Sequence, residues 1–186
     1  MHNLTPLSAR LSTLAAMAGG GAWVATGAIH LSGRDELRTG DIETALEHLL
    51  LGLMAAALVL TAPAIVALAR HARTRRPAYV AAAGQVLLAS AVTTTNIVGH
   101  DPVFFLVAAP LANAIWLFGA IALAVSLHRA GEVARVVAFG LPAVQIFALP
   151  LSIVGGPLVS GAYWLAVGYL LSVDALLRRE LLPATA

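Results

Sequence analysis

The sequence predicts an all-α integral membrane protein, a bundle of six transmembrane helices with both termini in the cytoplasm. Three observations lead to this prediction. Only 11% of the 186 residues are charged and 60% are hydrophobic, whereas about 25% of the residues in a soluble domain are charged. Several uncharged runs are long enough to cross a bilayer core of ~30 Å. The arginines lie mostly in alternate connections between these runs, as the positive-inside rule describes.

Composition excludes several kinds of site and partner. Cysteine is absent, so there are no disulfides, thiolate metal sites, iron–sulfur clusters or covalently attached haem. All 11 basic residues are arginine, which together with the abundant alanine is typical of a high-GC bacterial genome. Because the arginines lie in short connections, they indicate membrane topology and not nucleic-acid binding. We therefore expect a multi-pass protein of the bacterial inner membrane whose main partner is the lipid bilayer.

The whole chain is expected to form a single transmembrane domain. Its helices are expected at approximately residues 11–30, 41–69, 78–99, 102–127, 136–154 and 158–177. The first contains Gly19, Gly20 and Gly21, which favour the close approach of a neighbouring helix. The second begins with an acidic turn for which Asp41 is the expected N-cap, and Pro63 predicts a kink within it.

The last two helices are separated by a turn and not by charge. No residue from 136 to 173 is charged, and such a run is too long for one crossing. Gly155, Gly156 and Pro157 are typical turn residues and divide the run into a fifth and a sixth segment.

The arginines then orient the bundle. Arg10, the connection over 70–76, the connection over 129–135 and the tail at 178–179 fall on one side, whereas the other side has only Arg34 and Arg38. The positive-inside rule places the arginine-rich side in the cytoplasm. The acidic start of the second segment and the end of the third then belong to the outer face.

A group of side chains on this outer face could bind a metal ion. His30, His48 and His100 lie at the ends of three segments, and imidazoles with a carboxylate are the ligand set expected for zinc, copper, nickel or non-haem iron. Glu47 is the candidate catalytic residue, as a base or as a fourth ligand. Alternatively, two neutral imidazoles could hold haem b. Taken one at a time, these histidines are also consistent with interfacial polar residues in solvent.

Amides in the middle of the segments indicate either helix packing or a cavity. Gln85, Asn113 and Gln145 each lie about ten residues, or ~15 Å, from a segment end. They could bond to one another between helices, or they could form the floor of a cavity entered from outside. On the second interpretation the candidate cofactor-binding residues are Gln85, Asn96, Asn113, Tyr163 and Trp164. The last two also suit an interfacial aromatic belt.

Four functions follow as hypotheses. The first is a membrane metalloprotein or haem protein that performs redox or other chemistry on a lipophilic or small substrate. The second is a small permease or channel for a cation or metal. The third is a non-catalytic subunit of a larger complex. The fourth is a metal-free intramembrane enzyme with Glu47 as general acid. A lipophilic small molecule and a second copy of the chain are the expected partners besides lipid.

Overall fold

Six α-helices and two short 3₁₀ helices make up the part of the chain that the computed structural model describes, which is residues 6–32, 42, 44–149 and 151–172. Their order is α1 (Pro6–Ser32), α2 (Ala45–Leu68), η1 (Ala69–His71), α3 (Arg76–Val98), α4 (Phe105–Ala130), α5 (Arg135–Ala148), η2 (Ser152–Val154) and α6 (Gly156–Ser172). The prediction of an all-α fold is confirmed for these residues.

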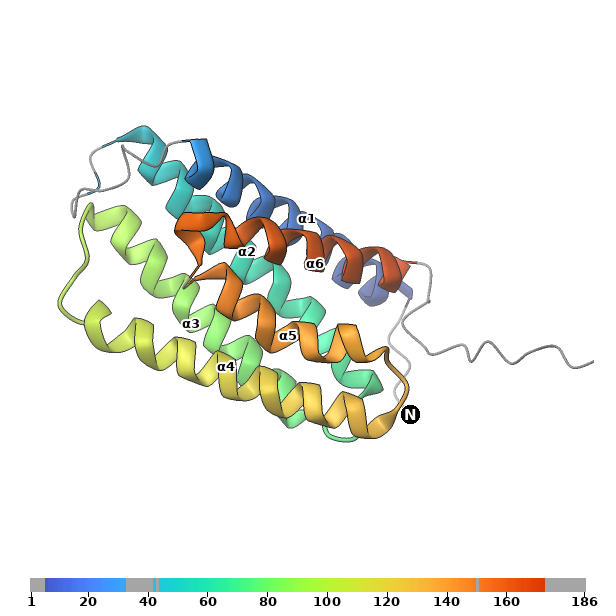
Figure 1. The fold of residues 1–186 in the computed structure, drawn as a ribbon. Coiled ribbons are helices and arrows are strands. Elements are labelled where there is room, and N and C mark those ends of the chain that lie inside the picture. The colour runs from blue at the N-terminus through green and yellow to red at the C-terminus, as the bar shows by residue number, and fades with distance from the viewer. Residues whose placement is uncertain (1–5, 33–41, 43, 150, 173–186) are drawn as a thin grey trace, which may run out of the picture.

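The helices form a ring that follows the order of the chain (Figure 1). Each helix packs against the next, and α6 packs back against α1, so the first and last helices lie side by side. Short connections between consecutive helices favour antiparallel neighbours. The interior is filled mainly by alanine, leucine and valine, together with three buried tryptophans, Trp23, Trp116 and Trp164.

Four of the helices are long and apolar enough to span a membrane. They cover Arg10–Ser32, Ala45–His71, Arg76–Val98 and Phe105–Ala130. Helix α5 has 14 residues, which corresponds to about 21 Å at the helical rise and falls short of a ~30 Å core. The expected fifth segment, 136–154, is therefore divided into α5 and η2. The residue before a proline is disfavoured in a helix, and Leu149 precedes Pro150.

The backbones of α3 and α4 are in direct contact through glycine. A Cβ atom added to Gly84 of α3 would lie 2.7 Å from the Cα of Trp116, and one added to Gly119 of α4 would lie 2.8 Å from the Cα of Ala81. Two carbon atoms cannot approach so closely, so only glycine fits at either position. Small residues bring transmembrane helices together in this way because close packing is the main attraction between them.

Helices α1 and α6 meet through a similar set of glycines. Gly20 and Gly27 are seven residues apart on α1, and Gly161 and Gly168 are seven residues apart on α6. A Cβ at Gly20 would lie 2.8 Å from the backbone nitrogen of Leu165. The expectation that the first segment packs closely is met at Gly20, whereas Gly21 has open space around its Cα.

The helix ends explain where the observed bounds differ from the expected ones. Helix α2 begins at Ala45 because Thr44 is its N-cap, and Thr44 forms a capping box with Glu47. Asp41, the expected N-cap, lies outside the described residues. Helices α3 and α4 end at Gly99 and Gly131, which both have positive φ angles and adopt the left-handed conformation that favours glycine.

Candidate functional site

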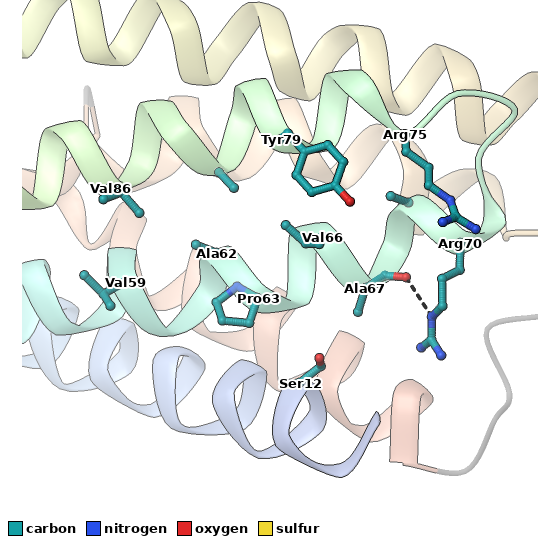
Figure 2. Close-up of a pocket in the computed structure, with 12 residues that line it drawn as sticks. Ser12, Val59, Ala62, Pro63, Val66, Ala67, Arg70, Arg75, Tyr79 and Val86 are labelled. Atoms are coloured by element: carbon teal, nitrogen blue, oxygen red, sulfur yellow. Dashed lines mark hydrogen bonds between the residues drawn. The ribbon is translucent and has the colours of Figure 1, made fainter. Parts of the chain in front are cut away.

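A groove of about 550 Å³ lies between α2 and α3 (Figure 2). Val59, Ala62, Pro63 and Val66 of α2 form one wall, and Ser12 of α1 lies at its edge. The opposite wall is formed by side chains of α3, namely Tyr79, Ala82 and Val86. Half-exposed apolar side chains such as Val59 and Val86 border the groove, so it opens on the outer surface of the bundle.

The length of the groove matches half a bilayer. Along α2 and η1 it extends from Val59 to Arg70, or about 16 Å at 1.5 Å per residue. Half of a ~30 Å hydrocarbon core is ~15 Å. The length of the groove is therefore close to the thickness of one lipid leaflet.

Two arginines mark one end of the groove. Arg70 and Arg75 both line it, and both lie at the same end in Figure 2. The Nε of Arg70 donates a hydrogen bond to the carbonyl of Ala67, 3.1 Å away. Among the described residues, the ion pair in this region joins His71 and Glu132 at 3.4 Å, and no carboxylate pairs with Arg70 or Arg75.

The start of α3 adds to the positive potential at this end. Arg75 is the N-cap of α3 and makes no capping bond with its side chain, and Arg76 is the first residue of the helix. A helix N-terminus carries a partial positive charge, so cations there are unfavourable by typically 0.3–1 kcal/mol each. An anion placed at this end would relieve that repulsion.

Glu47, the candidate catalytic residue, has a structural role in α2. Its Oε2 accepts hydrogen bonds from the backbone N–H of Thr44 at 2.8 Å and from the Thr44 hydroxyl at 2.9 Å. In return its own N–H donates to the Thr44 hydroxyl oxygen at 3.2 Å. The side chain is buried, so this capping box accounts for its position at the start of the helix.

The outer histidines each have their own surroundings. His48 Nδ1 lies 2.7 Å from Asn96 Oδ1 and links α2 to α3. His30 Nδ1 bonds to the carbonyl of Thr26, one turn earlier in α1. His100 is exposed beyond the end of α3. Within the described ranges, no three His, Asp or Glu side chains are grouped so that they could hold a metal ion.

The three mid-segment amides belong to two separate interhelical contacts. Gln85 donates from Nε2 to the Thr61 hydroxyl at 3.2 Å and joins α3 to α2. Gln145 donates from Nε2 to the backbone carbonyl of Asn113 at 2.7 Å and joins α5 to α4. Interhelical bonding is therefore observed, but Gln85 does not share it with the other two amides. Asn113 and Gln145 also line a separate cavity of about 290 Å³.

Tyr163 and Trp164 pack inside the bundle. The Tyr163 hydroxyl donates to the carbonyl of Val137 in α5 at 2.8 Å, and its ring fills the space left by Gly140. Trp164 is buried, and its ring meets that of Tyr163 edge to face at a centroid distance of 5.2 Å. Neither residue lines the groove or the cavity at Asn113.

Comparison with known proteins finds no relative whose role could be transferred to this chain. No protein-family model matches the chain, and no curated protein or solved structure is significantly similar to it.

The arginine-ended groove is not predicted by the sequence. The arginines of residues 67–78, ALARHARTRRPA, indicate membrane topology and do not by themselves reveal a groove. The sequence does contain an indication of the groove. Small residues before and after the arginines, such as Ala62 and Ala82, leave space between α2 and α3. Recognising the groove would have required knowing which face each helix turns toward the other.

Proposed function

We propose that this protein binds an anionic, lipid-like molecule in the groove between α2 and α3. The observation that carries the proposal is an apolar groove, about as long as one leaflet is thick, that ends at two arginines without a carboxylate partner among the described residues. The ligand would be an amphiphile with a phosphate head at Arg70 and Arg75 and a hydrocarbon chain along Val59, Ala62 and Val86.

The chemistry of the groove supports this class of ligand. The guanidinium group donates hydrogen bonds in a planar fork that matches phosphate oxygens. Basic residues at the membrane surface attract anionic headgroups by about 1 kcal/mol each. A volume near 550 Å³ is within the 300–1,000 Å³ range of ligand sites, which are mostly apolar with a few polar groups.

The proposed topology is inferred from the position of the arginines. If both termini are cytoplasmic, the connection from α2 to α3 faces the cytoplasm, where inner-membrane leaflets present anionic lipid. With six crossings, α5, η2 and the residues between them together form the fifth crossing of the membrane. Helix α6 then forms the sixth and brings the chain back to the cytoplasmic side. We place the protein in the bacterial inner membrane on this basis.

The test compares two lipids that have identical chains. Detergent-purified protein is mixed with equal amounts of phosphatidylglycerol and phosphatidylcholine, and native mass spectrometry measures the ratio of the lipids that stay bound. We expect a preference for phosphatidylglycerol of roughly tenfold or more, because two arginines contribute about 1 kcal/mol each. The double variant Arg70→Gln/Arg75→Gln should lose this preference.

Two matched controls make the result specific to the groove. The double variant Arg129→Gln/Arg135→Gln removes the same charge from the α4–α5 connection and should keep the preference. Ala82→Phe fills the groove and should reduce the binding of both lipids, whereas Ala83→Phe, on the neighbouring exposed residue, should not. Equal retention of the two lipids by the unmodified protein would contradict the proposal.

A second candidate function is a haem site at His30 and His48, because two imidazoles suffice for haem, whereas no three His, Asp or Glu side chains are grouped for a metal ion among the described residues. The observation that favours it is that His30 and His48 both use Nδ1 for a hydrogen bond to an oxygen. Metal-binding histidines are typically held in this way, with Nε2 left as the ligand atom. Elemental analysis and an absorption spectrum of the purified protein provide the test. We expect one haem per chain, lost in His30→Ala and His48→Ala, and colourless, iron-free protein would refute it.

A further inference from the structure

A second cavity, of about 290 Å³, lies between α4 and α5 and shares no lining residue with the groove. Its walls are mostly aliphatic, and two amides interrupt them. The lining residues are Asn113, Ala114, Leu117, Gln145, Ile146 and Leu149. Ile146 is half-exposed on the outside of the bundle, so the cavity borders the surface that faces lipid.

The hydrogen bonds fix the orientation of both amides. Gln145 Nε2 lies 2.7 Å from the backbone carbonyl of Asn113, and Asn113 Nδ2 lies 2.9 Å from the carbonyl of Ala109. A backbone carbonyl can only accept, so each of these atoms must be the NH₂ group and not the oxygen. The oxygen of Gln145 therefore points away from the carbonyl of Asn113.

This oxygen has no donor in the part of the chain that the structure describes. Gln145 is 5% exposed, and its Oε1 has no hydrogen-bond partner among the described residues. Gln145 lies ten residues from the start of α5, or about 15 Å along the axis, where a bilayer would supply no water. Buried carbonyl groups without a hydrogen-bond partner are uncommon in proteins, so each one needs an explanation, such as a bound molecule that supplies the donor.

We infer that the cavity binds an uncharged, mainly apolar molecule that donates one hydrogen bond, from a hydroxyl or N–H group, to Gln145 Oε1. The aliphatic walls exclude a charged ligand, because no charged side chain lines the cavity to balance it. The volume suits a compact molecule of one or two rings. Because Oε1 is covered, binding has to include a small shift of the surrounding side chains.

The test uses two probes that differ in one donor. 1-Naphthol carries a hydroxyl group, and 1-methoxynaphthalene has the same rings without a donor. Isothermal titration of detergent-purified protein should show about tenfold tighter binding of 1-naphthol, which is the difference expected from one buried hydrogen bond. Equal affinity for the two probes, or binding of neither, would overturn the inference.

Variants identify the residue responsible. Gln145→Met keeps the length of the side chain and removes the carbonyl, so it should bind the two probes equally. Gln85→Met removes the other buried glutamine, which is bonded to Thr61 and lies outside this cavity, and it should keep the preference. A preference that survives Gln145→Met would overturn the inference. If that variant fails to fold, Leu117→Phe, which fills the cavity, should abolish the binding of both probes, and undiminished binding would overturn it.

Discussion

Two parts of the ring are held together in different ways. In the glycine pairs, α1 with α6 and α3 with α4, backbone lies directly against backbone. Around α5 side-chain hydrogen bonds join the helices, such as Tyr163 to the carbonyl of Val137 and Ser160 to that of Val144, and among the described residues backbone contact through glycine is limited to Gly156 against the carbonyl of Phe147 at the α5–α6 turn. Backbone contact leaves no space between helices, whereas side-chain bonds leave gaps. The cavity at Gln145 accordingly lies beside α5 and not within a glycine pair.

The most damaging change should be the addition of one methyl group between α3 and α4. Gly84→Ala places a Cβ 2.7 Å from the Cα of Trp116, so the two helices must separate, and we expect a loss of about 3 kcal/mol in the free energy of unfolding. Unfolding in SDS, followed by circular dichroism, measures it. Gly52→Ala is the control, because its nearest neighbour would be 3.8 Å away. Equal stability of the two variants would show that backbone contact does not hold this pair.

A smaller effect is expected where α1 meets α6. A Cβ at Gly20 would lie 2.8 Å from the nitrogen of Leu165, and a Cβ at Gly21 would meet nothing within 4 Å. We expect Gly20→Ala to cost about 2 kcal/mol and Gly21→Ala to be neutral or to stabilise by up to ~1 kcal/mol through helix propensity. Thermal unfolding of the adjacent variants gives the comparison directly. The same melting temperature for both would refute the close contact.

The smallest effect belongs to the contacts of α5. Tyr163→Phe removes the hydrogen bond to the carbonyl of Val137, which should lower the free energy of unfolding by about 1 kcal/mol or less, as for other hydrogen bonds between membrane helices. Tyr169→Phe, at an exposed position of the same helix, should change nothing. A loss from Tyr163→Phe as large as that from Gly84→Ala would remove the distinction between the two parts of the ring.

Much of the helical architecture could be predicted because it depends on local properties of the sequence. Apolar runs and turn glycines are local signals, and Gly155 does end η2 with a positive φ. The candidate sites depend on how each helix is rotated, which a nearly uniform apolar composition does not reveal. The apolar runs predict that the start of α2 and the end of α3 lie at the same end of the bundle, and His48 and Asn96 do bond there. The same runs could not show that Glu47 turns back onto Thr44.

The groove and the cavity were harder to predict for a related reason. Each is a space left between side chains, and its existence depends on the separation of two helices. For the groove, that separation depends on contacts elsewhere along the same two helices, such as Gln85 with Thr61 and Asn96 with His48. The arginines were visible in the sequence, whereas the space beside them was not.

The packing of α6 against α1 has a consequence for biosynthesis. Gly27 leaves the ribosome about 130 residues before Gly161, which is a delay of roughly 7 to 26 seconds at 5–20 residues per second. During that time the face of α1 that carries Gly20 and Gly27 lacks α6, the helix that covers it in the complete protein. Ribosome stalling before α6, or a premature stop codon in that region, should therefore leave a protein that membrane proteases recognise and remove.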